Sequence, residues 1–499
     1  MKIIVDDKTM QQCDKNTIEH YKIPSIVLME QASMAVAHEI CELFKKDSRI
    51  LIACGSGNNG GDGIATGRIL YLLGYNVTLF YVSDMSKCSS ECKIQSDIVA
   101  QYDIPVKHDI NKMSDEYDVI VDAVFGVGLS REITGKYKDA IEFLNKLSGY
   151  KIALDIASGI SSSNGQILGC CFEAKLTLAI AFAKIGQYLF PGAQYSGEIK
   201  VLNININEKS FLDMKPNVFL LQKEDLKNLP VRNEDSNKGS FGKILVISGQ
   251  KNMAGAAYFS SKAAYLTGCG LVKIFTVEEN RTVLQTLIPE AILDTYIAEK
   301  FDENALEQSI EWADTIICGP GIGTDTSSIR IVDLVLKHND KKCILDADAL
   351  NIISSDISKT EQLNGNFILT PHLKEMSRLC NRSISDIKKD IINIAKQYAL
   401  KWKCTIVLKD SRTIVASTED SVYLIDSGCS GMATAGAGDV LSGIVGALFS
   451  ETDNALKAAA YAAYIHGLSG SYIQESISNR SIIADDILNG LRKVLKWAN

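Results

Sequence analysis

The stretch ATAGAGDVLSGIVGAL, residues 433–448, contains a glycine-rich turn that leads directly into an apolar segment of helical length. Gly436 and Gly438 permit tight backbone geometry, and the first turn of a helix offers N–H groups that bind anions. Asp439 follows at the predicted helix N-terminus. An aspartate there can simply cap the helix, but beside an anion site it is also suited to deprotonate a hydroxyl that attacks a phosphate. The stretch therefore predicts a helix with a phosphate-transfer site at its N-terminus.

Apolar runs of strand length precede this stretch and alternate with patterns of helical spacing. Continuous Val-, Ile- and Leu-rich runs are typical of parallel strands buried on both faces, with helices between them. Strands are predicted from Lys243 (KILVISGQ) and at residues 271–277, 315–318, 343–345, 367–369 and 405–408, and helices at 383–398 and 455–472. The C-terminal half is therefore predicted to be a three-layer α/β/α domain.

The N-terminal half shows the same alternation. Strands are predicted at residues 50–53, 77–82, 119–124, 152–154 and 176–183, and a helix at 64–75. This pattern predicts a second three-layer α/β/α domain with a Rossmann-like, doubly wound sheet. The polar stretch at residues 207–238 contains two prolines and many charges, which is typical of a domain junction. We therefore expect two domains, at residues 1–212 and 222–499.

The composition excludes several classes of protein. With 499 residues the chain is too long for one core, and its net charge of −8 offers no basic face for nucleic acid. No apolar run approaches the roughly 20 residues needed to cross a bilayer, and the N-terminus lacks an apolar signal core. The 13 cysteines contain no C-x-x-C pair, so we expect free thiols in a cytoplasmic protein.

The first predicted strand of the N-terminal half ends in CGSGNNGGDG, residues 54–63. A strand, a glycine-rich loop and a helix in this order present N–H groups to an anion, although a tight turn alone can also require glycine. Asp122, Asp155 and Ser158 follow later strands. Since the carboxyl ends of parallel strands open into one crevice, the oxygens of Asn59, Asp122 and Ser158 can converge on a hard cation. Taken singly, each of these side chains can instead cap a helix or a turn.

The segments GSGNNGGDG, VDAVFGVGLSR and DIASG, in this order, make about residues 1–210 resemble the NAD(P)H-hydrate epimerase family. The resemblance implies contacts with the hydrated dinucleotide from Asn58, Asn59, Gly60, Gly61 and Asp62, from Gly126, Val127, Gly128, Leu129, Ser130, Arg131 and Glu132, and from Asp155. It also implies potassium ligands at Asn59, Asp122 and Ser158, and a reaction centre near Lys184. The family usually has proline where this chain has Ala157, so the backbone φ is less restricted at this position. The neighbouring ligand residue, Ser158, is present.

Epimerisation of a hydrated nicotinamide requires a site that holds the ring and assists proton movement. Asp155 and Lys184 provide one carboxylate and one amine at strand ends that face the same crevice. We hypothesise that Asp155 is the acid/base of this reaction and that Lys184 is its electrostatic partner.

Five further motifs of the C-terminal half lie at predicted strand ends or helix starts. They are MAGAA (253–257), ICGPGIG (317–323), LDADALN (345–351), LTPHLKEM (369–376) and IVLKDSRT (406–413). His372, one of only six histidines, follows Thr-Pro at a strand exit, and this place favours a ligand contact over a purely structural role. Lys409 ends its predicted strand before a polar turn.

Together with GAGDVLSG, these motifs make about residues 225–499 resemble the ribokinase-like superfamily, and within it the ADP/ATP-dependent NAD(P)H-hydrate dehydratases. The resemblance implies that Ala256, Gly321, His372 and the catalytic base Asp439 contact the hydrate. It further implies an adenine-nucleotide site at Lys409, Asp410, Ser411, Arg412, Thr413 and Gly438, with Mg²⁺ accompanying ADP or ATP.

The two resemblances imply a bifunctional enzyme that epimerises R- and S-NAD(P)H hydrate and dehydrates the S epimer with ADP or ATP. Likeness to bacterial-type fused enzymes favours ADP, and family likeness implies a homo-oligomer whose other partners are NADH hydrate, NADPH hydrate and the nucleotide. The alternative is a ribokinase-like small-molecule or vitamin-precursor kinase with a non-catalytic N-terminal binding domain, because such kinases share the GAGD motif. The NNGGD domain discriminates between the two, since a vitamin kinase has no evident need for it.

Overall fold

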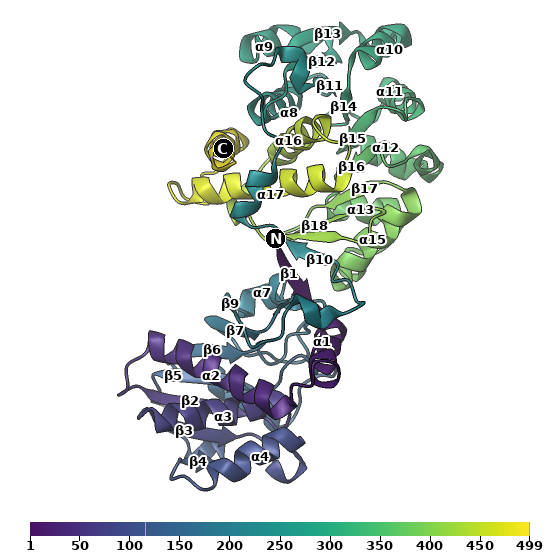
Figure 1. Ribbon diagram of the computed structural model, residues 1–499. Helices are drawn as coiled ribbons and strands as arrows, with labels where there is room; N and C mark the ends of the chain where they lie inside the picture. Colours follow the sequence, from purple (N-terminus) through teal and green to yellow (C-terminus); the bar gives the residue numbers. More distant parts are fainter. Residues whose placement is uncertain (115, 499) are drawn as a thin grey trace. The chain divides into compact units, whose positions relative to one another are not determined.

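The computed structural model describes residues 1–114 and 116–498, and the chain divides into two compact units (Figure 1). One unit comprises Ile3–Val218, and the other comprises Met1–Lys2 together with Phe219–Asn499. Both units are mixed α/β folds with parallel sheets, as the sequence predicts. We describe each unit separately.

The main sheet of the N-terminal unit is parallel, with the strand order β4-β3-β2-β5-β6-β7-β9. Its strands are β2 (Arg49–Cys54), β3 (Asn76–Tyr81), β4 (Val106–Lys107), β5 (Val119–Ala123), β6 (Tyr150–Leu154), β7 (Leu176–Ile180) and β9 (Glu198–Leu202). The chain order changes direction between β2 and β5. At such a switch point the carboxyl ends of neighbouring strands open a crevice where ligands bind.

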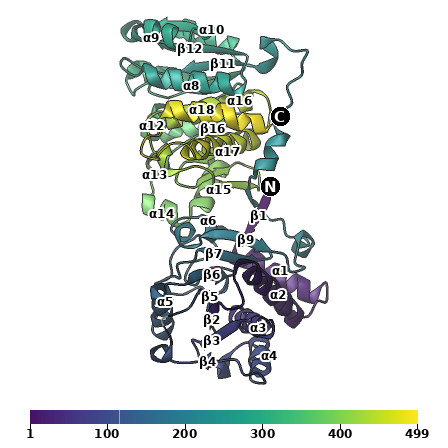
Figure 2. The same ribbon diagram turned by 90° about the vertical axis from the view of Figure 1, so that its left-hand side faces the viewer.

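Helices cover both faces of this sheet (Figure 2). The covering helices are α2 (Ser25–Leu43), α3 (Asn58–Leu72), α4 (Ser90–Val99) and α5 (Lys136–Lys146). The first three pack on one face against side chains such as Ile50 and Ile52, whereas α5 packs on the other face against Leu51 and Ile120. Successive strand side chains point to opposite faces, so a wholly apolar strand is buried on both. This confirms the predicted three-layer, Rossmann-like architecture.

Two details predicted for this unit are wrong. One strand is predicted over residues 176–183, but the chain forms β7 and then a short β8 (Ala183–Lys184), because Ala181 adopts a positive φ of 61°. The short strand pairs instead with β1 (Lys2–Val5), through Ile4 and Val5. The glycine-rich segment is predicted as a loop before a helix at 64–75, but α3 already begins at Asn58, with Gly57 as its N-cap. The NNGGD segment is therefore the start of a helix.

Three further helices complete the N-terminal unit, namely α1 (Asp7–Glu19) and the short α6 (Ile185–Tyr188) and α7 (Gly192–Tyr195). Asp6 caps the start of α1 by accepting a hydrogen bond from the N–H of Thr9 at 2.8 Å. Toward its other end, Thr17 Oγ1 donates to Ser210 Oγ at 2.9 Å. Both ends of α1 are thus held by side-chain hydrogen bonds.

The sheet of the C-terminal unit contains the order β13-β12-β11-β14-β15-β16-β17-β18-β19. Its strands are β11 (Lys243–Ile247), β12 (Leu271–Val277), β13 (Ile292–Tyr296), β14 (Thr315–Cys318), β15 (Lys342–Leu345), β16 (Phe367–Leu369), β17 (Thr405–Leu408), β18 (Thr413–Ala416) and β19 (Val422–Ile425); β10 is Val218–Leu220. The pairings are parallel from β13 to β17 and antiparallel from β17 to β19.

Helices also line both faces of the C-terminal sheet (Figure 1). On one face lie α8 (Ala254–Thr267), α16 (Ala437–Ser450) and α17 (Ala455–Gln474), and on the other lie α10 (Glu303–Trp312), α11 (Thr326–Lys337), α12 (Asp348–Ser355), α13 (Leu373–Cys380) and α15 (Ile391–Trp402). The remaining helices are α9 (Arg281–Leu287), α14 (Ile384–Lys389) and α18 (Ala484–Val494). The single helix predicted at 383–398 is wrong, because Asp390 leaves the helical conformation between α14 and α15.

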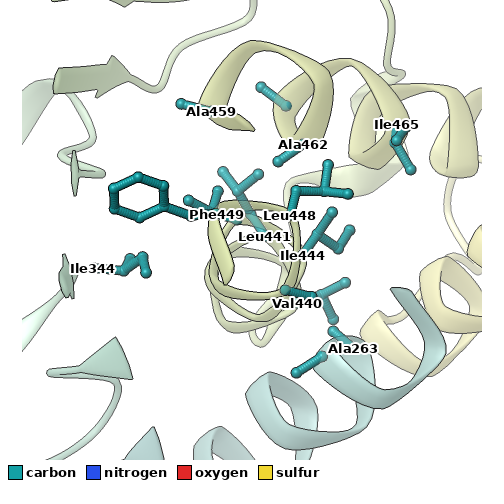
Figure 3. Packing of buried hydrophobic residues seen from close by; sticks show 14 of the residues in the cluster. Ala263, Ile344, Val440, Leu441, Ile444, Leu448, Phe449, Ala459, Ala462 and Ile465 are labelled. Carbon is teal, nitrogen blue, oxygen red and sulfur yellow. The ribbon is translucent and has the colours of Figure 1, made fainter. Parts of the chain in front are cut away.

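The helix α16 lies in an extended apolar cluster (Figure 3). Val440 is fully buried and faces Ala263 of α8. The two helices approach so closely that a Cβ at Gly443 would lie 2.2 Å from the carbonyl oxygen of Ser260. Packing on this scale leaves the helix few alternative positions. The turn that carries Asp439 therefore stands on a rigid support.

Two expectations from composition concern the whole chain. The 13 cysteines are free thiols, eight of them buried. Within residues 1–114 and 116–498, no helix combines the length and the apolarity that a membrane span requires.

Candidate active sites

A cavity of about 570 Å³ lies in the N-terminal unit, beside the loops that follow β2, β5 and β6. Many predicted site residues line it, namely Asn58, Asn59, Asp62, Gly126, Val127, Gly128, Leu129, Ser130, Arg131, Asp155 and Lys184. Its apolar wall is formed by Met10, Ile18, Leu28, Met29, Ala32, Ile204 and Ile206. An apolar wall facing a few convergent polar groups is typical of a site for a small organic ligand.

Three predicted contact residues, Gly60, Gly61 and Glu132, do not line this cavity. A Cβ at Gly60 would lie 2.0 Å from the carbonyl oxygen of Gly55, and a Cβ at Gly61 would lie 2.6 Å from Met29 Cε. These glycines allow the first turn of α3 to pack closely against its neighbours. Their direct contact with a substrate stays a prediction.

Asp155 and Lys184 form a buried ion pair on the cavity wall. The Lys184 side chain is 0% exposed, and its Nζ donates to Asp155 Oδ1 and, at 3.0 Å, to the carbonyl oxygen of Ile180. The N–H of Ile180 donates to the same carboxylate oxygen at 3.0 Å. Little water screens such a pair, so the attraction is stronger than it would be at the surface. The pair keeps one charged carboxylate in a defined orientation toward the cavity.

The backbone of Asp155 is strained. Its φ of 67° lies in the left-handed region, which residues with a Cβ seldom adopt. Gln187 Nε2 donates to its carbonyl oxygen at 2.8 Å, and its own N–H donates to the carbonyl oxygen of Leu178 at 2.9 Å. Strain that surrounding hydrogen bonds maintain is concentrated at functional sites in proteins. The strain therefore favours a functional role for this carboxylate.

Two more carboxyl groups, those of Asp14 and Asp62, line the same cavity. Burial, and then the charge of Asp155, raises the pKa of Asp14 to about 7, against the opposing effect of Lys184. Burial, with Asp155 and Asp14, raises the pKa of Asp62 well above its ordinary value. Asp14 is absent from the predicted site, because it stands in the polar stretch QQCDKNT, without a glycine loop or a strand end to mark it.

Asp122 and Ser158 meet behind the loop that follows β5. Asp122 is fully buried, and it accepts hydrogen bonds from the Ser158 N–H and Oγ, both at 2.7 Å, and from the Val124 N–H at 3.1 Å. Burial nevertheless raises the pKa of Asp122 to about 6. A cation bound here would offset the cost of burying the charge.

The third predicted cation ligand, Asn59, has an unsatisfied side chain. Within the part of the chain that the structure describes, its buried Oδ1 and Nδ2 lack any hydrogen-bond partner. A Cβ at Gly126 would lie 3.5 Å from Asn59 Oδ1, so Asn59 lies beside the loop that follows β5. The same loop contacts Ser158, because the Phe125 N–H donates to Ser158 Oγ at 2.8 Å. Buried polar atoms without partners call for a bound ion or water, and oxygen donors suit a hard cation. The donor set therefore fits a hard cation.

In the C-terminal unit, Asp439 lies in the first turn of α16, just after Gly436, whose φ is 88°. Burial, and then the nearby charge of Asp346, raises the pKa of Asp439 to about 6, against the opposing effect of Lys409. A carboxylate of this kind is ionised at neutral pH and still accepts a proton readily. Its place at a helix N-terminus suits a base beside a bound phosphate.

Asp346 connects this turn to the end of β17. It is 1% exposed and accepts hydrogen bonds from Lys409 Nζ at 2.8 Å and from Ser442 Oγ at 2.6 Å. Burial alone would raise the pKa of Asp346, but Lys409 and Ser442 outweigh it, so the pKa is lowered. A Cβ at Gly438 would lie 3.6 Å from Lys409 Nζ, so this lysine reaches the turn that carries the base. The LDADALN motif alone does not distinguish Asp346, which makes these contacts, from Asp348.

His372 caps α13 and leaves one edge of its ring half-exposed beside Glu375. Its Nδ1 accepts hydrogen bonds from the N–H groups of Lys374 and Glu375, both at 3.1 Å, at the start of α13. Burial and the charge of Lys409 lower the pKa of His372. In the neutral ring the proton therefore sits on Nε2, and the side chain is 50% exposed. The cap occupies Nδ1, and Nε2 lies 3.4 Å from Glu375 Oε1 on the half-exposed edge of the ring. A ligand contact by His372 stays a prediction.

The other predicted residues of this unit fall into two groups. A Cβ at Gly321 would lie 3.1 Å from the Cβ of Ala256, so these two predicted hydrate contacts are neighbours. The predicted nucleotide segment from Asp410 to Arg412 forms the turn between β17 and β18, and Thr413 begins β18. The roles of both groups stay predictions.

Both halves of the chain match known families. Residues 25–186 match the family described as YjeF-related protein N-terminus, and residues 244–492 match the family described as NAD(P)H-hydrate dehydratase. A bifunctional NAD(P)H-hydrate repair enzyme from Moorella thermoacetica is 31% identical over 513 residues, which cover 99% of this chain and 96% of the relative. The chain belongs to the bifunctional NAD(P)H-hydrate repair enzyme family. A member from Escherichia coli is 29% identical and covers 94% of this chain and 89% of its own length.

Solved structures resemble the C-terminal unit of this family member. The ADP/ATP-dependent NAD(P)H-hydrate dehydratase from Bacillus subtilis, co-crystallised with ATP/Mg²⁺, is 25% identical with a TM-score of 0.50, covering 57% of this chain and 100% of that chain. A ribokinase-like superfamily protein from Enterococcus faecalis is 27% identical with a TM-score of 0.50, covering 56% and 95% of the two chains. The predicted ribokinase-like fold is confirmed.

Membership of the repair-enzyme family decides between the two functions that the motifs leave open. The bifunctional relatives match this chain over both halves, including the NNGGD segment. A vitamin-precursor kinase with a non-catalytic N-terminal domain is therefore not supported, and the chain is an NAD(P)H-hydrate epimerase and dehydratase.

Proposed function

We propose that residues 1–212 interconvert the R and S epimers of NADH hydrate and NADPH hydrate, and that residues 222–499 dehydrate the S epimer at the expense of ADP or ATP. One observation supports this division most strongly. Each unit carries one carboxylate in a setting suited to acid–base chemistry, namely Asp155, paired with Lys184 on the wall of a cavity, and Asp439 at a helix N-terminus. A dehydratase that acts on one epimer consumes a mixture completely only if an epimerase supplies the other.

In the epimerase site, Asp155 is the acid/base that transfers a proton, and the Lys184 ammonium stabilises the negative charge of the Asp155 carboxylate. The apolar wall of the cavity holds the nicotinamide ring, while the polar wall holds the sugar and phosphate groups. The lining provides both kinds of group, because Met29 and Ile206 line the cavity together with the loops at 56–59 and 124–131. This arrangement gives the ring a site from which bulk water is partly excluded.

Asn59, Asp122 and Ser158 would hold a potassium ion in the N-terminal unit. The ion would supply positive charge that neutralises the buried Asp122 and orders the loop from Val124 to Gly126. The unsatisfied Asn59 side chain and the buried carboxylate support this assignment.

Potassium should stabilise the N-terminal unit. At a concentration about 100 times its dissociation constant, a bound ion adds about 2.7 kcal/mol, which corresponds to a rise of about 5 °C or more in the melting temperature. Replacing choline chloride by potassium chloride at constant ionic strength, with thermal unfolding followed by calorimetry, measures this rise. Ser158→Ala should remove most of the potassium-dependent part, whereas Ser163→Ala, outside the site, should retain it. Equal potassium effects in both variants would argue against the assignment.

In the dehydratase site, Asp439 takes the proton of the ring hydroxyl, whose oxygen then attacks the terminal phosphorus of ADP or ATP. The phosphorus–oxygen bond to the remaining nucleotide breaks, and AMP or ADP leaves. The phosphorylated hydrate loses inorganic phosphate as the ring nitrogen lone pair assists cleavage of the carbon–oxygen bond. Loss of a proton from the adjacent ring carbon restores the double bond of NADH or NADPH. Phosphorylation thus converts hydroxide, a poor leaving group, into a good one.

The N–H groups after Gly436 and the Lys409 ammonium face the phosphates in this scheme. Magnesium that accompanies the nucleotide would supply positive charge to the phosphates. It draws most of its ligands from phosphates and water, so a protein cage is unnecessary.

Stoichiometry tests the dehydratase half of the proposal. Purified full-length chain, supplied with S-NADH hydrate and either ADP or ATP, should release one inorganic phosphate for each NADH that appears. Absorbance of the reduced nicotinamide and a phosphate assay measure the two products. NADH formation without nucleotide consumption, or nucleotide hydrolysis without NADH, would contradict it.

A further inference from the structure

The epimerase cavity contains a carboxyl group that neither the motifs nor the proposed roles use. Asp14 lies on α1 and lines the cavity together with Asp62, Asp155 and Lys184. These four side chains come from four separate elements, α1, α3, the loop after β6, and β8. Asp14 therefore approaches the cavity from a different wall than the Asp155–Lys184 pair.

The helix α1 holds Asp14 in place through long-range contacts. Asn16 Nδ2 donates to the carbonyl oxygen of Ser210 at 2.8 Å, and Thr17 Oγ1 donates to Ser210 Oγ at 2.9 Å. Cys13, the residue before Asp14 on the same helix, is fully buried. These anchors flank Asp14 on both sides and leave its side chain directed to the cavity.

The ionisable groups that face Asp14 include more carboxyl groups than ammonium groups. Asp62 and Asp155 are further carboxyl groups, whereas Lys184 commits its ammonium to Asp155 and to the carbonyl oxygen of Ile180. Burial and the Asp155 charge raise the pKa of Asp14 to about 7. Two carboxyl groups in one cavity thus have different surroundings, because Asp155 is paired with the Lys184 ammonium and Asp14 is not, and such a difference is how enzymes separate an acid from a base.

We propose that Asp14 is a second acid–base residue of the epimerase, which donates a proton to the ring hydroxyl of the hydrated nicotinamide from the α1 wall while Asp155 acts from the strand ends. The proposal rests on the proposed epimerase function. Asp62 lies in the same cavity, but it stands on α3 within the NNGGD segment rather than on α1.

The step balances as follows. Asp14 gives its proton to the hydroxyl oxygen on the ring carbon, the carbon–oxygen bond breaks, and its electron pair leaves with water. The lone pair of the ring nitrogen forms a double bond to that carbon. Water adds to the opposite face, the electron pair of the double bond returns to nitrogen, and the Asp155 carboxylate takes a proton from the added water. Proton exchange with solvent then restores the acid form of Asp14 and the carboxylate of Asp155 before the next turnover.

The test measures conversion of R-NADH hydrate to NADH, with nucleotide, by the full-length chain. The same chain's dehydration of S-NADH hydrate reports its second site independently. Asp14→Asn should lower epimerisation by a factor of about 100 or more and leave dehydration of the S epimer unchanged. Asp14→Glu should recover part of the loss. Glu19→Gln, an exposed carboxyl change on the same helix, should have no effect.

The pH profile separates proton donation from a structural role. Because the acid form of Asp14 is lost as the pH rises through about 7, wild-type epimerisation should fall above that pH, and Asp14→Asn should lack this fall. An unchanged rate in Asp14→Asn, a lower rate with an unchanged profile, or a wild-type profile without the fall would overturn the role of Asp14. A wild-type chain that dehydrates the S epimer but never converts the R epimer would instead overturn the proposed epimerase function.

Discussion

Replacing Asp439 with alanine should lower kcat for dehydration of the S hydrate by a factor of about 10³ to 10⁴, at the upper end of what one acid–base group contributes. The hydroxyl of the hydrate is a weak nucleophile until it loses its proton, and Asp439 is the carboxylate at the helix N-terminus where the phosphate is expected. Nucleotide binding should remain, because the N–H groups and Lys409 are unchanged. Single-turnover formation of NADH and equilibrium binding of ADP measure the two properties.

The pH dependence adds a second test of this base. Since the base must be unprotonated and burial raises the pKa of Asp439 to about 6, wild-type dehydration should decline as the pH falls below about 6. Asp453→Asn, which changes a fully exposed carboxylate, is the matched control and should retain the wild-type rate. Near-normal turnover by Asp439→Ala would refute the assignment.

Replacing Asp155 with asparagine should abolish epimerisation to within the background rate, a loss of about 10² to 10⁴. The variant removes the proposed proton acceptor, and it also leaves the fully buried Lys184 ammonium without its partner. Breaking a buried pair in this way destabilises a protein by about 3–5 kcal/mol. Conversion of R-NADH hydrate measures the activity, and thermal unfolding measures the stability.

A double variant separates the two effects of this change. Asp155→Asn combined with Lys184→Met removes both charges, so it should recover stability without recovering epimerisation. Dehydration of the S epimer serves as the internal control in both variants. Wild-type epimerisation in Asp155→Asn would exclude Asp155 as the acid/base.

The predictable parts of the fold were those with strong local signals. Runs such as residues 50–53 are apolar throughout, and a strand buried on both faces explains such a run best. The turn before Asp439 was equally clear, because glycines followed by an apolar segment permit few alternatives.

The parts that escaped prediction depend on tertiary context. The positive φ of Ala181 splits a strand that its apolar sequence would continue. Asp14 has no motif, and only the folding of α1 over the cavity reveals it. Asp346 and Asp348 share one motif, but only the contact with Lys409 distinguishes them. Sequence periodicity indicates which residues are buried, but it does not indicate which residues far away in the sequence they contact.

The central claim is that one chain carries two cooperating activities, and a mixture of epimers tests it most directly. Full-length chain should convert an R and S mixture of NADH hydrate, with nucleotide in excess, completely to NADH in a fast phase followed by a slower one. In Asp155→Asn the reaction should stop after the fast phase, at the S fraction of the mixture. A wild-type reaction that also stops at the S fraction, or that yields no NADH, would contradict the account.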